Sequence, residues 1–455
     1  MRIKTCLLLF IASVSTFTFS KQISSSEPTM VIENYQFTLD TIVPELLKKY
    51  KVPAAGVGII RDGEVIVEKV YGQHQLGQEA PNNTIFNVAS ITKSIVAVTV
   101  MKLVENGDWD LDEPLSNYFT DPDIAADPRA RELTTRHCLA HTTGFKNWRW
   151  HEEDSKLQFN FNPGEKYQYS GEGMEYVRKA IEKKFDTDFS ALAHSLVFKP
   201  LGMSDTTLNW ISDKDVARFA KWHDTSGNLH DVDHETPKTN AADDLLITVN
   251  DMLKFDLAVL NHKIISEESF NLMVSPQISV NNNINQSLGW VSLKDDATGI
   301  YLINHDGGDT GVIATNIIFP NSNDAIAIFT NGNNGASVTN SIIKDVLNGG
   351  LAVVKKLRWE NNMPEIIELK QESLDRFTGV YKTNRGFDIQ IIKDGNQLMT
   401  VSTVYPRQTI YAISKDEFVP IPFEVYFTFK ETEKGRILTL SNPNREVELE
   451  GILNE

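Results

Sequence analysis

Residues 86–101 read FNVASITKSIVAVTVM, a turn that opens into an apolar helix. From Ile95 to Val104 nearly every position is apolar, whereas a surface helix carries its apolar residues in a single stripe. We therefore expect a buried helix around which the core is organised. Ser90 and Lys93 lie at its start, one helical turn apart, so both side chains project from the same face.

This pair has the chemistry of a nucleophile and its base. A serine hydroxyl attacks poorly until a neighbour accepts its proton, and lysine does so when burial or nearby positive charge lowers its pKa. The helix N-terminus adds free backbone N–H groups that suit a developing oxyanion. Ser90 would also serve as a helix N-cap with Lys93 solvated, so the assignment depends on motifs further along the chain.

The 455 residues exceed one ordinary domain, and the pattern divides them into five segments. These are a signal peptide at 1–20, a flexible polar lead-in at 21–35, a main domain at 36–357, a charged linker at 358–374 and a β domain at 375–455.

The first segment predicts export, to the periplasm or the medium. Arg2 and Lys4 precede an apolar stretch, residues 6–14, that is too short to span a bilayer, and small residues follow. The alternative is an uncleaved anchor. Cleavage changes the formal net charge from −17 to −19, which disfavours nucleic acid and anionic lipid as partners. Only Cys138 then remains, so no intramolecular disulfide is possible, and we expect a buried thiol.

The order of elements in the main domain is strands, then helices, then strands. The expected strands are 55–60, 65–70, 289–293, 312–319 and 325–329, and the expected helices after the core helix are 176–185, 189–198, 250–260 and 338–347. This order predicts an α+β fold, an antiparallel sheet flanked by helices with an inserted, mainly helical subdomain.

Residues from Phe377 onward alternate between apolar and polar positions. The alternating runs are 387–391, 398–402, 425–429 and 437–440, with turn sequences at 393–396 and 433–435. The pattern predicts a small antiparallel β domain, either a sandwich or a barrel.

Three separated motifs in the main domain carry a family resemblance. They are Ser90-Ile91-Thr92-Lys93, Tyr169-Ser170-Gly171 and His305-Asp306-Gly307-Gly308. In this order and spacing they resemble the motifs of serine β-lactamase-like hydrolases, in the branch of class C β-lactamases, D-alanyl-D-alanine carboxypeptidases and esterases. The resemblance covers about residues 36–355 and implies the β-lactamase/transpeptidase-like fold.

The resemblance also implies roles. Ser90 would form an acyl-enzyme, with Lys93 or Tyr169 as its base, and His305 would offer the substrate a hydrogen bond or a positive charge. The backbone N–H groups of Ser90 and Gly308 would form the oxyanion hole, and Gly307 would let the substrate approach the strand closely.

Two positions bear on the substrate. Relatives commonly carry asparagine where this chain has Gly171, so the amide contact with an acyl amide is missing and β-lactam hydrolysis is disfavoured. Trp222-His223 lies where relatives often have a glycine-tyrosine pair at the floor of the site, so the resemblance implies that His223 contacts the substrate. Trp148 and Trp150 fit either the mouth of the site or the core.

The sequence therefore predicts an exported serine hydrolase for D-amino-acid peptides or small esters and amides, including cell-wall peptides, that needs no metal and no organic cofactor. A β-lactamase proper and a non-catalytic, penicillin-binding-like ligand-binding protein are the alternatives. We expect no nucleic-acid partner and no integral membrane span after signal cleavage.

Overall fold

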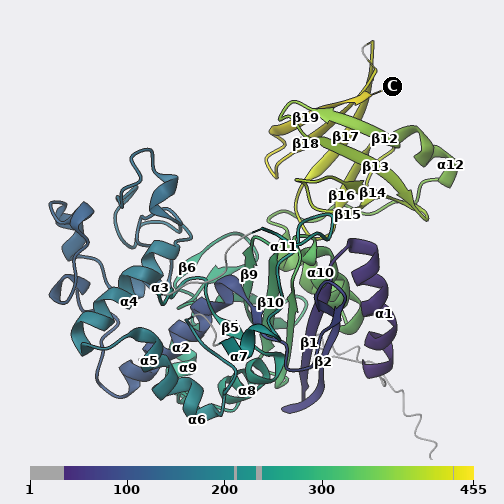
Figure 1. Ribbon diagram of the computed structural model, residues 1–455. Coiled ribbons are helices and arrows are strands. Elements are labelled where there is room, and N and C mark those ends of the chain that lie inside the picture. The colour runs from purple at the N-terminus through teal and green to yellow at the C-terminus, as the bar shows by residue number, and fades with distance from the viewer. Residues whose placement is uncertain (1–34, 210–212, 232–237, 434, 455) are drawn as a thin grey trace, which may run out of the picture.

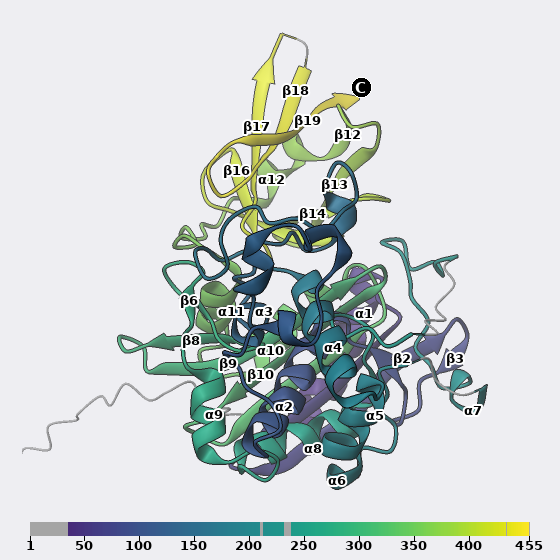
Figure 2. The same ribbon diagram turned by 90° about the vertical axis from the view of Figure 1, so that its left-hand side faces the viewer.

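The computed structural model describes residues 35–209, 213–231, 238–433 and 435–454. The predicted signal peptide and nearly all of the predicted lead-in lie outside these residues. The described chain forms a body of helices and strands that carries a β-barrel at one end (Figures 1 and 2). Within the described residues, no helix is long and apolar enough to cross a membrane.

The body is built on a nine-stranded sheet whose strand order is β3-β2-β1-β11-β10-β9-β8-β7-β6, with every neighbouring pair antiparallel. Its strands are β1 (Ala54–Arg61), β2 (Glu64–Gln75), β3 (Gln78–Glu79), β6 (Ile278–Ser279), β7 (Asn285–Gln286), β8 (Val291–Asp295), β9 (Ile300–Asp309), β10 (Val312–Phe319) and β11 (Asp324–Thr330). Because β1 pairs with β11, the two ends of the main domain meet in the middle of one sheet. The predicted α+β fold is confirmed.

Helices cover both faces of this sheet (Figure 1). On one face lie α1 (Tyr35–Tyr50), α10 (Gly335–Val346) and α11 (Gly350–Arg358). On the other face lie α2 (Thr92–Glu105) and α8 (Val249–Leu260), which belong to a second apolar core. Apolar positions of α2 are buried all round the helix, as its continuous apolar sequence predicts.

The chain between β2 and β6 forms the inserted helical part. Its other α-helices are α3 (Thr135–Leu139), α4 (Gly171–Phe185), α5 (Phe189–Ala193), α6 (Lys199–Leu201), α7 (Asp213–Val216) and α9 (Glu267–Val274). Apart from α3, residues 115–151 consist of short 3-10 turns and loops. The small pair β4 (Phe86–Asn87) and β5 (Leu246–Ile247) joins the insertion to the start of α2. The helix predicted at 189–198 is not regular, because a π-helical turn, His194–Phe198, follows α5.

The C-terminal strands close into an eight-stranded antiparallel barrel. They are β12 (Gly379–Thr383), β13 (Asp388–Asp394), β14 (Gln397–Val401), β15 (Gln408–Ala412), β16 (Glu417–Pro420), β17 (Tyr426–Thr432), β18 (Gly435–Ser441) and β19 (Val447–Asn454). A four-residue helix, α12 (Gln371–Leu374), precedes it. Of the two expected architectures, the barrel is the correct one.

Candidate active site

The segment that carries Ser90 is a tight turn ahead of α2. Ala89 has a φ of 46°, a backbone conformation that is uncommon for a residue with a side chain. Its N–H donates to the Asn87 side chain at 2.6 Å, and its carbonyl accepts from the Thr92 hydroxyl at 2.6 Å. These bonds fix the turn, so the Ser90 hydroxyl emerges beside Lys93.

Lys93 is a buried lysine with two hydrogen-bond partners. Its Nζ lies 2.8 Å from Ser90 Oγ and 2.7 Å from the carbonyl oxygen of Ala242. Among the described residues, no carboxylate forms an ion pair with this ammonium. Burial lowers the pKa of Lys93 to about 8, although the charges of Asp243 and Glu175 oppose the shift. A neutral lysine, able to accept a proton from Ser90, is thus accessible near neutral pH.

Tyr169 completes the group just before α4. The Lys93 Nζ lies 4.8 Å from the centre of its ring, and the ring of His141 packs on it at 4.4 Å. Burial raises the pKa of Tyr169, and the Ser90 hydroxyl hydrogen-bonded to the phenol only partly offsets this. The resting phenol is therefore protonated and is a proton donor. Between the two bases left open by the sequence, the shifted pKa values favour Lys93.

His305 lies on β9 at the other side of Tyr169, with ring centres 6.4 Å apart. Its Nδ1 donates to the carbonyl oxygen of Asp306 at 2.8 Å, which leaves the Nε2 lone pair as an acceptor. Burial, reinforced by the charge of Lys93, lowers the pKa of His305 to about 4. The imidazole is neutral at pH 7, so of the two roles expected for it the hydrogen bond fits and the positive charge does not.

Gly307 brings β9 against the nucleophile turn. A Cβ on this residue would lie 2.0 Å from the carbonyl oxygen of Val88, so only glycine permits the approach. Gly308 follows it and pairs with Ile313 on β10. The close approach places the strand of Gly308 directly beside the turn that bears Ser90.

Gly171 opens α4, and an aromatic side chain fills the space in front of it. A Cβ on Gly171 would meet ring carbons of Trp148 at 2.8 and 2.9 Å. The Gly171 N–H donates to Asn147 Oδ1 at 2.8 Å, and Trp148 stacks on Trp150, whose side chain is 61% exposed. The direction in which an asparagine at 171 would project is therefore occupied by an indole.

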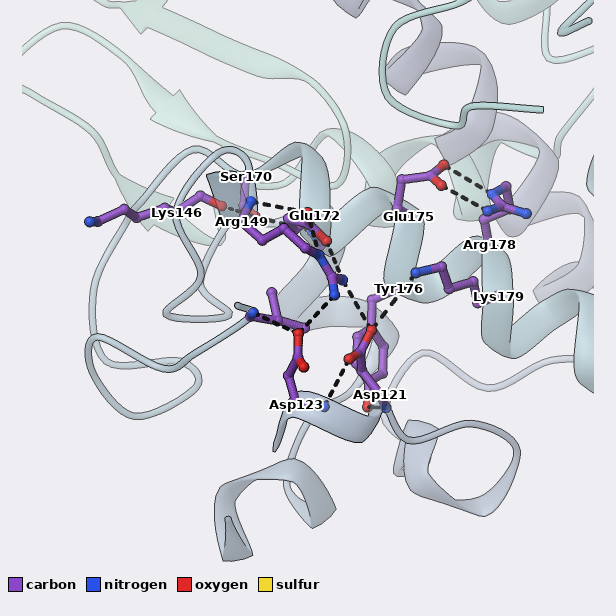
Figure 3. A network of polar contacts seen from close by, with 12 residues as sticks. Asp121, Asp123, Lys146, Arg149, Ser170, Glu172, Glu175, Tyr176, Arg178 and Lys179 are labelled. Carbon is purple, nitrogen blue, oxygen red and sulfur yellow. Dashed lines mark hydrogen bonds and ion pairs between the residues drawn. The ribbon is translucent and has the colours of Figure 1, made fainter. Parts of the chain in front are cut away.

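An arginine network fastens this loop to α4 (Figure 3). Arg149 donates to both carboxylate oxygens of Glu172 at 3.0 and 2.8 Å, and it also pairs with Asp121 and Asp123. The Ser170 hydroxyl donates to the carbonyl oxygen of Lys146 at 3.0 Å. The loop and the segment of Tyr169 thus form one braced unit.

His223 lies apart from this group. It belongs to a bridge with Leu229 and Gly332, and its Nδ1 donates to the carbonyl oxygen of Asn331 at 3.1 Å. Within the described part of the chain, no contact joins it to Ser90, Lys93 or Tyr169. Its predicted contact with the substrate stays a prediction.

Asp243 is a site residue that the sequence interpretation missed. Its Oδ1 accepts from Ser90 Oγ at 3.4 Å, across 153 positions of sequence. Burial raises the pKa of Asp243 to about 7, although the charge of Lys93 opposes the shift. No motif spacing marks this residue, because an Asp-Asp pair in a polar stretch is also typical of a solvated loop.

The family model described as Beta-lactamase matches residues 39–347. Esterase EstB from Burkholderia gladioli is 27% identical over 197 residues, which is 37% of this chain and 50% of that protein. A second curated relative is covered over 43% of its length, so the chain spans about half the length of the curated relatives it matches.

Solved structures share the fold. The octameric penicillin-binding protein homologue from Pyrococcus abyssi is 20% identical with a TM-score of 0.61, over 91% of this chain and 99% of that one. The D-alanine carboxypeptidase AmpC from Burkholderia cenocepacia is also 20% identical, with a TM-score of 0.57 over 66% and 94% of the two chains. The matched residues 39–347 contain Ser90, Lys93, Tyr169 and His305, and the chain belongs to the β-lactamase family.

Proposed function

We propose that this protein is a serine hydrolase that acts through an acyl-enzyme on Ser90. The observation that carries the proposal is the buried Lys93 ammonium 2.8 Å from the Ser90 hydroxyl, with a pKa lowered to about 8. Neutral Lys93 takes the proton of Ser90 while Oγ attacks the substrate carbonyl carbon. The backbone N–H groups of Ser90 and Gly308 receive the negative charge that develops on the carbonyl oxygen.

The protonated phenol of Tyr169 supplies the proton that the leaving group needs. It donates as the bond between the carbonyl carbon and the leaving group breaks, and the Lys93 ammonium then restores the proton to the phenol. Water then attacks the acyl-enzyme, and the same groups transfer protons in the reverse direction. This step releases the acid and regenerates Ser90. D-amino-acid peptides, small esters and small amides are the proposed substrates.

The test is hydrolysis of a short p-nitrophenyl ester by the wild-type protein and by Ser90→Ala. Ser94→Ala is the matched control, because Ser94 is a second serine near the start of α2 whose hydroxyl donates to the Ile91 carbonyl oxygen at 2.7 Å. We expect activity in the wild type and the control and none in Ser90→Ala, with an acyl adduct on the peptide that contains Ser90. Equal activity in Ser90→Ala would overturn the proposal.

The reaction with a penicillin distinguishes the proposed hydrolase from a β-lactamase proper. The indole in front of Gly171 leads us to expect a slowly released adduct rather than rapid turnover. Absence of any reaction, with ligand still bound, would favour the non-catalytic binding protein. We also propose export, and N-terminal sequencing of the protein from the producing cell would show cleavage after residue 20.

A further inference from the structure

The side chain of Asp243 lies beside the nucleophile Ser90, but the acyl-transfer chemistry does not require its carboxylate. Its single hydrogen bond among the described residues is the long one, 3.4 Å, from Ser90 Oγ. Proton transfer between Ser90, Lys93 and Tyr169 proceeds without this carboxylate. A carboxyl group this close to the reacting atom is therefore available to the substrate.

The backbone around Asp243 is fixed on both sides. The Ala242 carbonyl oxygen accepts from Lys93 Nζ at 2.7 Å, and the Ala241 N–H donates to Glu175 Oε1 at 2.7 Å. Beyond Asp243, the Leu245 N–H donates to the Thr92 hydroxyl at 2.9 Å. The backbone that carries the carboxylate is thus fixed before a ligand arrives, which lowers the entropic cost of binding.

In the part of the chain that the structure describes, no cation forms an ion pair with this carboxylate, although the charge of Lys93 acts on it. Lys93 Nζ is instead hydrogen-bonded to Ser90 Oγ and to the Ala242 carbonyl oxygen. The charges of Asp309 and Asp244 add to the negative field at Asp243. A positive charge on the ligand would be attracted here, since partial burial strengthens the interaction.

The distance limits where that positive charge lies on the substrate. At near-attack geometry the carbonyl carbon lies about 3–3.5 Å from Oγ. A nitrogen on the adjacent carbon is two bonds further, each about 1.5 Å. With Oδ1 only 3.4 Å from Oγ, such a nitrogen can lie within the 2.7–2.9 Å or so of a charge-assisted hydrogen bond.

We propose that Asp243 binds the protonated amine of substrates that carry an ammonium group on the carbon next to the reacting carbonyl. The preferred substrates are then esters and amides of amino acids with a free amino group, including the N-terminal residue of peptides. The inference rests on the proposed function, because it assigns a substrate class to that same site.

The experiment compares free and blocked substrates. Alanine p-nitroanilide and N-acetyl-alanine p-nitroanilide, in both D and L forms, are given to the wild type, Asp243→Asn and Asp309→Asn at pH 7. We expect kcat/KM of the wild type to be at least tenfold higher for the free amine than for the acetylated substrate. In Asp243→Asn this ratio should be about tenfold smaller. Asp309→Asn removes an equal charge from an exposed residue that does not contact Ser90, and we expect its preference to change less than about threefold.

The outcomes separate the two proposals. A wild type that hydrolyses the acetylated substrate as well as the free amine overturns the role of Asp243 and leaves the serine hydrolase intact. An equal loss on both substrates in Asp243→Asn does the same, because it indicates a positioning role. Inactivity of the wild type on all four anilides and on p-nitrophenyl esters overturns the hydrolase itself.

A binding measurement covers the case in which Asp243→Asn folds poorly. Calorimetric titration of the Ser90→Ala variant, in which Asp243 is kept, should detect D- or L-alaninamide and at least tenfold weaker binding of its N-acetyl form. Equal affinity for the two amides would contradict the proposal.

Discussion

Lys93 combines two properties that rarely occur together: it is fully buried, and it has no ion-pair partner among the described residues. We predict that kcat/KM for a neutral ester rises with pH and levels off above an apparent pKa of about 8, because the reactive form of Lys93 is unprotonated. Lys93→Met should lower kcat by roughly 10²–10⁴-fold. Stopped-flow hydrolysis between pH 5.5 and 9.5 measures both effects.

The matched control for this profile is Asp243→Asn on the same neutral ester. Asp243 raises the pKa of Lys93, so removal of its charge should move the acid limb of the profile to lower pH. An acid limb that stays in place in Asp243→Asn would show that another group controls the rate.

Asp256 and Asn316 form a buried pair beneath the site, on α8 and β10. Asn316 Nδ2 donates to Asp256 Oδ1 at 2.8 Å, while Asp256 Oδ2 and Asn316 Oδ1 have no partner. Burial raises the pKa of Asp256 to about 7. A proton on Oδ2 would donate to Asn316 Oδ1, and the acid and the amide would then share two hydrogen bonds.

This pair predicts a pH-dependent stability. The folded pKa is above the unfolded value of about 3.9, so the contribution is complete below that value and is lost as pH rises through about 7. Asp256→Asn should keep both hydrogen bonds as an amide pair without titrating. The difference in free energy of unfolding between the two proteins should therefore change by about 2–4 kcal/mol between pH 4 and 8. Urea titrations that show parallel pH dependence for both proteins would contradict the protonated pair.

At the scale of the elements, the loop at 146–151 and the start of α4 act as one unit around Tyr169. We predict that Gly171→Asn destabilises the protein by about 1–3 kcal/mol, because its Cβ overlaps the ring of Trp148. Trp148→Ala should relieve the overlap, so the double variant should lose less stability than the sum of the single losses. A double-mutant cycle measured by urea unfolding tests this. Strictly additive losses in the free energy of unfolding would show that the Trp148 ring moves aside without destabilising the protein.

The local apolar pattern predicted those helices and strands whose own residues show a clear pattern of burial. The apolar run of α2 and the strand at Val312–Phe319 were predicted because burial on all sides leaves a continuous apolar sequence. The short strands β15 and β16 were missed, since both are buried at nearly every position and so display no period of two.

Contacts between distant segments were not predictable from spacing. The motifs identified Ser90, Lys93, Tyr169 and His305 as candidates through a resemblance, and the structure brings these four together. Asp243 contacts Ser90 because the loop that contains it folds back to the start of α2. No local sequence pattern predicts that contact.

At the scale of the whole molecule, the barrel has an apolar core of its own, and two of its residues also pack into the core of the body. Met399 and Ile421 of the barrel belong to the apolar cluster of α1, α10 and α11. The Tyr50 hydroxyl lies 3.1 Å from that of Thr409, and the Arg407 N–H donates to Asn334 Oδ1 at 2.8 Å. We therefore predict a single cooperative thermal transition, with equal calorimetric and van't Hoff enthalpies. Two resolved transitions would show that the interface is weaker than these contacts indicate.

The barrel also borders the site through the back of β9. A cavity of about 540 Å³ is lined by Gly307 and Gly308 on one side and by Phe423 on the other. At its base Arg358 forms an ion pair with Asp306, the residue after His305. Burial alone would raise the pKa of Asp306, but Arg358 outweighs burial and the net shift is downward.

Loss of the segment from Arg358 onward should therefore affect catalysis as well as stability. A chain that ends at Leu357 exposes the part of the body's core that Met399 and Ile421 cover and leaves Asp306 without its cation. We therefore expect both a lower melting temperature and a lower kcat on p-nitrophenyl esters. Arg358→Met in the full-length protein separates the two effects, because it keeps the barrel and removes only the ion pair. If the reduced kcat arises from Asp306, Arg358→Met should reproduce most of it with a smaller fall in melting temperature. A truncated chain with unchanged kcat would instead assign the barrel to stability alone.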